Sequence, residues 1–162
     1  MISRRQFLRG DISGRQAPLR PPWARPEAHF LSTCTRCGEC VKACPENILA
    51  LVRGYPEVRF AQGACTFCGK CQEACSPQAL VARQDERPWA LLAQANTNCL
   101  AYRDVVCRSC GDACGEAAIR FSPRIGGAAR PEILSEHCTG CGACVSACPA
   151  GAVTMAAAGG KA

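Results

Sequence analysis

The spacing of the cysteines constrains this chain more than any other feature of its sequence. Sixteen of the 162 residues are Cys, and they fall into four short runs. The last run, EHCTGCGACVSACPAGAVT at 136–154, has two, two and three residues between successive cysteines and a proline directly after the fourth. Thiols this close together on one loop suit a shared metal centre better than disulfides between distant segments.

Disulfide-rich secreted scaffolds, zinc proteins and iron–sulfur proteins can all contain cysteine at this density. Zinc sites usually take pairs of ligands from two separate knuckles, whereas each run here supplies three or four Cys. Both histidines, His29 and His137, stand outside any ligand spacing, so we expect them to be surface or packing residues. The pattern therefore favours iron–sulfur clusters over zinc sites and disulfides.

The four runs form an internal repeat. The first two begin at Cys34 and Cys65 and the last two at Cys99 and Cys138, which indicates two similar modules in tandem. Large apolar residues are scarce, with five Phe, two Trp and two Tyr. We therefore expect a thin core, part of which is replaced by bound cofactors.

The runs predict four [4Fe–4S] clusters. A C-x2-C-x2-C loop can supply thiolates to three irons of one cluster, and in two-cluster ferredoxins the Cys before the proline binds the partner cluster. This rule uses all sixteen thiols. The predicted ligands are Cys34, Cys37, Cys40 and Cys75 for cluster I; Cys65, Cys68, Cys71 and Cys44 for cluster II; Cys99, Cys107, Cys110 and Cys148 for cluster III; and Cys138, Cys141, Cys144 and Cys114 for cluster IV.

Full ligation predicts an electron carrier rather than an enzyme, because an iron with four sulfur partners has no open position for a substrate. The third run departs from the others: seven residues separate Cys99 from Cys107, and Gly115 stands in the place of the proline. We expect the longer loop to alter solvent access and the potential of cluster III. A tolerated insertion is the alternative, and cluster III would be a labile centre with three thiolates if Cys99 did not bind.

The predicted fold class is α+β: two tandem bacterial-type two-[4Fe–4S] ferredoxin modules, each with a small antiparallel sheet and short helices around its clusters. One or two helical turns should carry the third and fourth Cys of each run, and glycines between the ligands should expose N–H groups to sulfur. Trp23 and Trp89 should cover the first module. Strands are predicted at 48–52, 57–60, 79–82, 118–121, 132–134 and 152–155. The predicted boundaries are a basic extension at 1–28, modules at 29–82 and 99–156, a linker at 83–98 and a tail at 157–162.

The N-terminal extension is basic and contains SRRQFL, which resembles a twin-arginine export signal. No apolar stretch or cleavage site follows it, so we expect it to be retained in the cytoplasm as a recognition segment or a plain basic tail.

The net charge of +6 counts every thiol as neutral. Four clusters with their thiolates would bring it to roughly −2, so nucleic-acid binding is not indicated. No stretch is long enough to span a membrane.

Several segments resemble the NapF family, the ferredoxin-type accessory proteins of the periplasmic nitrate reductase system. The long gap in the third run is part of the resemblance. The segments are SRR near the start, RPPW at 20–23, HFLSTCTRCGECVKAC at 29–44, GYPEVRF at 54–60, CTFCGKCQEAC at 65–75, CLAYRDVVCRSCGDAC at 99–114 and CTGCGACVSACP at 138–149.

The resemblance implies a cytoplasmic iron–sulfur protein whose partner is the catalytic subunit of periplasmic nitrate reductase. It would assist maturation of that subunit before export, by supplying electrons or by helping to install its [4Fe–4S] cluster, and its sixteen Cys would be the ligands. Two other functions stay open at this point: a permanent electron-transfer subunit of a larger oxidoreductase, and a carrier or sensor that gives up a labile cluster.

Overall fold

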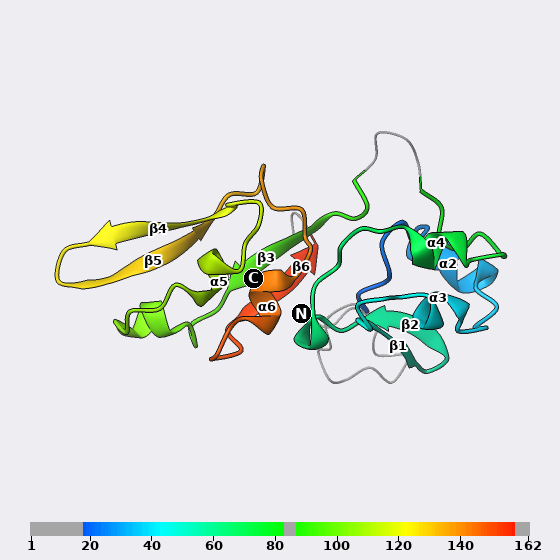
Figure 1. Cartoon of the computed structure of the whole chain (residues 1–162), viewed down its shortest axis with the longest axis horizontal. Coiled ribbons are helices and arrows are strands. Elements are labelled where there is room, and N and C mark those ends of the chain that lie inside the picture. Colours follow the sequence, from blue (N-terminus) through cyan, green and yellow to red (C-terminus); the bar gives the residue numbers. More distant parts are fainter. Residues whose placement is uncertain (1–17, 83–86, 158–162) are drawn as a thin grey trace, which may run out of the picture.

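The computed structural model describes residues 18–82 and 87–157, and the SRRQFL segment lies outside these ranges. Figure 1 shows two halves that follow each other along the chain, each built from short helices and small sheets. This is the predicted α+β architecture. The first half contains α2 (Glu27–Thr33), α3 (Glu39–Lys42), β1 (Leu49–Val52), β2 (Tyr55–Val58), η1 (Phe60–Gln62) and α4 (Lys70–Glu73). The second contains β3 (Leu91–Ala95), η2 (Leu100–Arg103), α5 (Ser109–Asp112), β4 (Ile119–Arg124), β5 (Gly127–Ile133), α6 (Ala143–Ser146) and β6 (Val153–Ala157).

One local turn recurs after the last Cys of every run. Three places beyond that Cys the backbone is left-handed, with φ between 50° and 57°, and its N–H donates to the carbonyl of the Cys at 2.9–3.2 Å. Only one of the four residues is glycine: they are Asn47, Gln78, Ala117 and Gly151. The following residue is at most 2% exposed in each run: Ile48, Ala79, Ala118 and Ala152. The turn thus places the residue that follows it in the core.

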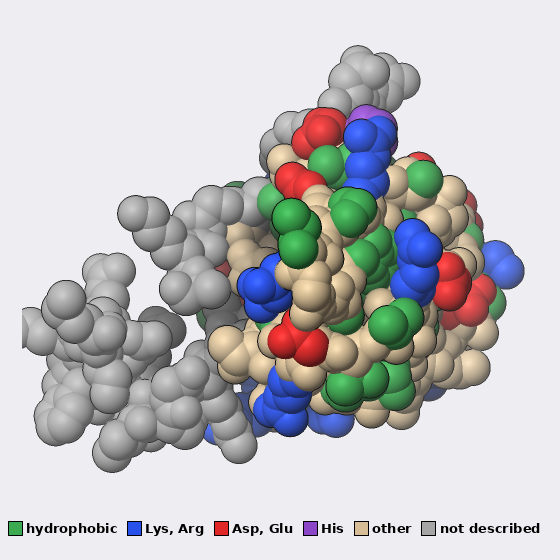
Figure 2. Space-filling model, turned by 90° about the vertical axis from the view of Figure 1, so that its left-hand side faces the viewer, with side chains coloured by type: hydrophobic (Ala, Val, Ile, Leu, Met, Phe, Trp, Pro, Cys, Tyr) green, Lys and Arg blue, Asp and Glu red, His purple; other side chains and the backbone are tan. Residues whose placement is uncertain are grey.

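The two predicted hairpins are confirmed. Strands β1 and β2 pair antiparallel, with Leu49 opposite Val58, and β4 and β5 do the same, with Ile119 opposite Ile133. The second hairpin is longer than the sequence predicted, and its tip exposes Ile125 completely. Hydrophobic side chains also lie between charged ones on this end of the molecule (Figure 2).

The segment predicted as a linker, 83–98, contains the strand β3. Strand β3 pairs antiparallel with β6 from the far end of the chain, with Ala93 opposite Met155. The physical reason is that β6 needs a hydrogen-bonding partner for its backbone, and the sequence gives no local one. Within the described residues no strand forms at the predicted 79–82; a single bridge between Leu80 and Ala24 stands in its place.

Residues 18–26 likewise belong to the first module, although the sequence placed them in a separate extension. The Arg25 N–H donates to the Ala79 carbonyl at 3.1 Å, and the Val81 N–H donates to the Trp23 carbonyl at 2.9 Å. This pairing extends the first module in the same way as the β3–β6 pairing extends the second. The two modules therefore repeat the same plan, each including a segment that precedes its cysteines.

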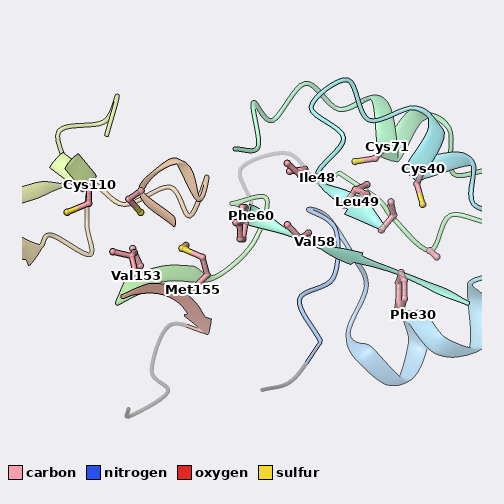
Figure 3. Packing of buried hydrophobic residues seen from close by; sticks show 14 of the residues in the cluster. Phe30, Cys40, Ile48, Leu49, Val58, Phe60, Cys71, Cys110, Val153 and Met155 are labelled. Atoms are coloured by element: carbon pink, nitrogen blue, oxygen red, sulfur yellow. The ribbon is translucent and has the colours of Figure 1, made fainter. Parts of the chain in front are cut away.

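The core is thin and includes cysteine. Phe30, Ile48 and Leu80 are among the largest fully buried side chains, and Figure 3 shows buried side chains of both halves with cysteines among them. The third Cys of every run is at most 9% exposed: Cys40, Cys71, Cys110 and Cys144. Sulfur thus occupies positions that larger apolar side chains fill in an ordinary domain.

We predict that Arg20→Ala lowers the free energy of unfolding by about 1–3 kcal/mol, since it removes a charge-assisted pair and two cation–π contacts. Arg20 donates to both carboxylate oxygens of Glu27 at 2.8 and 3.0 Å. Its guanidinium carbon also lies 5.0 Å from the ring centre of Phe30 and 5.4 Å from that of Tyr55. Urea unfolding of the iron-loaded protein without oxygen measures the effect. Arg59→Ala, at an exposed arginine of the same module, is the control, and equal stability of the two variants would show that residues 18–26 are not part of the module.

Candidate iron–sulfur centres

The first two sets of predicted ligands each line one cavity in the first module. Cys34, Cys37 and Cys40 share a cavity with Cys75, which comes from the other run of that module. In the same way, the thiols of the second run share theirs with Cys44 of the first run. Each cavity is therefore lined by three thiols of one run and the last thiol of the other run.

The third set is brought together in spite of its long gap. Cys99, Cys107 and Cys110 line one cavity with Cys148 from the fourth run. Helix η2 fills the gap and leaves Cys99 only 9% exposed. Each of the three cavities is thus lined by three thiols of one run and one thiol of the partner run, which fits three copies of the same cofactor.

The longer loop is held against the β4–β5 hairpin. Asp104 lies 3.6 Å from the Arg124 guanidinium, and the Arg130 guanidinium carbon lies 5.3 Å from the ring centre of Tyr102. Val105 and Val106 remain 50% and 82% exposed directly before the predicted ligand Cys107. The loop therefore covers the Cys99 side of the site and exposes apolar side chains beside Cys107.

In the fourth set, Cys144 lies near the other three predicted ligands. Burial first, and charge repulsion from the nearby thiols of Cys141, Cys138 and Cys114 second, raise the pKa of Cys144 to about 12. Cys110 of the third set acts in the same direction. The predicted ligands of cluster IV therefore lie within electrostatic reach of one another.

The third Cys of each run lies on a single helical turn. Gly38, Gly69 and Gly142 begin three of these turns with φ of 80° to 82°, a conformation that glycine adopts without strain. In the third run Arg108 takes this place with φ of −131°. The sequence predicted that these helices also carry the fourth Cys, but α3 ends at Lys42, and its cap, Ala43, precedes Cys44.

The buried thiols of Cys40 and Cys71 resist ionisation in the absence of a cation. Burial first, and neighbouring thiolates second, raise the pKa of Cys40 to about 11 and that of Cys71 to about 12. Exposed Cys37 differs: a backbone hydrogen bond from Glu39 and a side-chain hydrogen bond from Thr35 lower its pKa. Four thiolates in one such cavity need a compensating positive charge, and the iron ions of a cubane, each binding one thiolate, supply it. The donor set therefore fits the cofactor.

Backbone N–H groups point at several of the sulfurs. Ala118 donates to Cys114 Sγ at 3.3 Å and Ala152 donates to Cys148 Sγ at 3.2 Å, while Phe67 donates to Cys65 Sγ at 3.4 Å. Such bonds tune cluster potentials. The sequence suggested glycines for this role and missed these donors. The sequence positions of Ala118 and Ala152 could have indicated these donors, because each alanine follows the last Cys of its run by four residues.

The two histidines lie on the surface. His29 and His137 are both exposed. Within residues 18–82 and 87–157, no three His, Cys, Asp or Glu side chains are grouped so that they could hold a single metal ion. In the same part of the chain, no helix has the length and apolar character needed to cross a membrane.

Comparison with known proteins agrees with this geometry. Residues 33–88 and 105–152 match the 4Fe–4S dicluster domain family. The chain is 43% identical to the ferredoxin-type protein NapF of Escherichia coli K12, over 94% of this chain and 93% of that protein. It is 44% identical to NapF of Haemophilus influenzae, over 95% and 93%. The methylamine utilization ferredoxin-type protein MauM of Methylophilus methylotrophus is 34% identical, over 80% and 66%.

Two dicluster domains and sixteen cysteines in this spacing provide for four [4Fe–4S] clusters. The chain is thus an iron–sulfur protein of the ferredoxin type. Because the identity to NapF extends over almost the full length of both chains, this protein belongs to the NapF family of ferredoxin-type proteins.

Proposed function

We propose that the sixteen cysteines ligate the four clusters in the sets predicted from the sequence, with the last Cys exchanged between the two runs of each module. The shared cavities support this assignment, because Cys75 lines the cavity of the first run and Cys44 lines that of the second. A bound cluster supplies one-electron redox chemistry. The chain buries the third Cys of every run and donates N–H groups to several sulfurs, which tunes the potentials at which electrons pass. The protein acts as an electron carrier and not as an enzyme.

Iron counts of cysteine variants test the exchange of ligands. Cys37→Ala and Cys75→Ala remove ligands of the same proposed cluster, so each single variant and the double variant should contain about twelve irons per chain. Cys37→Ala with Cys44→Ala removes ligands of two clusters, so this double variant should contain about eight. Iron and acid-labile sulfide, measured on protein purified without oxygen, give both numbers.

If each run supplied all four ligands of its own cluster, the iron counts of the two double variants would be exchanged. If Cys44 completed the cluster of its own run, the Cys37/Cys44 pair would contain about twelve irons and the Cys37/Cys75 pair about eight. The two pairs therefore act as controls for each other.

We further propose that the protein acts in the cytoplasm on the catalytic subunit of a periplasmic nitrate reductase, before that subunit is exported. In this role it supplies electrons or helps to install the [4Fe–4S] cluster of the subunit. Membership of the NapF family, at 43–44% identity across nearly the whole chain, is the observation that carries the proposal. The exposed thiols Cys37 and Cys68 also support it, since they bring two of the proposed clusters to the surface where a partner can reach them.

A deletion strain tests the partner. Without the protein, the nitrate reductase catalytic subunit should accumulate with a reduced content of its cluster and a several-fold lower activity. The wild-type gene should restore both, whereas a gene for Cys37→Ala with Cys44→Ala should not. Fully active, fully loaded enzyme in the deletion strain would contradict this role. Stoichiometric purification with an exported oxidoreductase would instead identify a permanent subunit.

A further inference from the structure

The two modules meet where the second run of cysteines faces the fourth. The backbone N–H of Cys65 donates to the carbonyl of Cys141 at 2.8 Å. Both residues are proposed ligands, Cys65 of cluster II and Cys141 of cluster IV. The contact therefore joins the ligand loops of two clusters in different modules through one hydrogen bond.

A ring from the first module closes this contact. Phe60 in η1 is 5% exposed, and Gly142, directly after Cys141, lies next to its ring. A methyl group on Gly142 would overlap the Phe60 ring. Glycine at 142 thus serves two purposes: it begins α6 with φ of 82°, and it lets the fourth cysteine loop approach the first module closely. Figure 3 shows Phe60 between the two groups of cysteines.

Trp89, from the segment that connects the modules, seals the same junction. Its indole N–H donates to the Thr139 carbonyl in the second module at 3.2 Å. Its ring meets Phe60 and Phe67 of the first module edge to face, with ring centres 5.7 Å apart in each case. The sequence predicted that Trp89 covers the first module, and in the structure it contacts the second module as well. We name this set, Phe60, Cys65, Phe67, Trp89, Thr139, Cys141 and Gly142, the seam.

We propose that the seam joins the two modules into one electron path, with the clusters in the order I, II, IV, III and the crossing between modules at the Cys65–Cys141 contact. This order rests on the ligand assignment proposed above. Each transfer along the path oxidises one cluster by one electron and reduces the next by one electron. A one-electron donor protein at one end and a one-electron acceptor protein at the other complete the balance.

The same order follows from which thiols lie near one another. Within the first module Cys71 is within electrostatic reach of Cys40, which links clusters II and I. Across the seam Cys65 is within reach of Cys141, which links clusters II and IV. Within the second module Cys144 is within reach of Cys110, which links clusters IV and III. Helix contacts between α3 and α4, and between α5 and α6, agree with the two links inside the modules.

The ends of this path lie far apart. Cluster I is beside α3 and the exposed thiol of Cys37, at one end of the molecule in Figure 1, while the β4–β5 hairpin beside cluster III occupies the other end. At that second end Val106 is 82% exposed directly before Cys107. The path thus connects two separate surfaces, so that donor and acceptor can be bound at the same time.

Phe60→Ala tests the seam, with Tyr55→Ala as the matched control. Tyr55 is a partly buried ring in the same module whose aromatic neighbour is Phe30, away from the seam and outside the thiol cavities. Full-length, iron-loaded protein is reduced completely and studied by low-temperature EPR and small-angle X-ray scattering. Wild type and Tyr55→Ala should show the same magnetic interaction between modules and the same radius of gyration. Phe60→Ala should retain all its iron, lose the part of the interaction that arises between modules, and show a larger radius.

Trp89→Phe keeps an aromatic ring but removes the N–H bond to Thr139, and it should cause a partial loss of the same interaction. If Phe60→Ala does not retain its iron, Trp89→Phe is the variant that tests the proposal. A seam variant with all its iron, a wild-type EPR spectrum and a wild-type scattering curve would overturn the proposed path. Wild-type protein with fewer than about sixteen irons would instead overturn the ligand assignment, so the two failures can be distinguished.

Discussion

Charge compensation of buried thiolates is the interaction on which this structure depends. Sixteen cysteines take the place of a large apolar core, and the third Cys of each run is as buried as the surrounding aliphatic side chains. Burial and mutual repulsion raise the pKa of Cys71 and Cys144 to about 12, so these groups prefer to be neutral unless a cation is present. In the proposed assignment, iron would remove that penalty and link the two runs of each module. Folding and cluster binding are therefore expected to be coupled, as in other small metal-dependent domains.

The repeated turn after each run shows how the chain positions these groups. A left-handed residue three places after the last Cys sends the next side chain into the core, and at Cys114 and Cys148 it also aims an N–H at the sulfur. The same few residues thus complete the ligand loop, begin the next structural segment and contribute to the environment of the cluster. Differences between runs, such as η2 in the third, then provide a physical basis for different potentials within one chain.

Local patterns in the sequence predicted the modules, the two hairpins and the grouping of thiols, because each depends on residues close together or on a short exact spacing. Long-range features were missed. Strand β3 was placed in a linker because its partner β6 lies at the far end of the chain, and residues 18–26 were placed in an extension although Ala24 pairs with Leu80. The seam was missed for the same reason. Nothing in the sequence around Phe60 indicates that Gly142 will lie against it.

Anomalous diffraction at the iron absorption edge, from crystals grown without oxygen, tests the account most directly. It should locate four iron clusters, each bonded to three thiolates of one run and one of the partner run in the same module. Clusters II and IV should be the closest pair between modules, beside the Cys65–Cys141 hydrogen bond. A smaller number of clusters, ligands drawn from a single run, or a different closest pair would contradict the account.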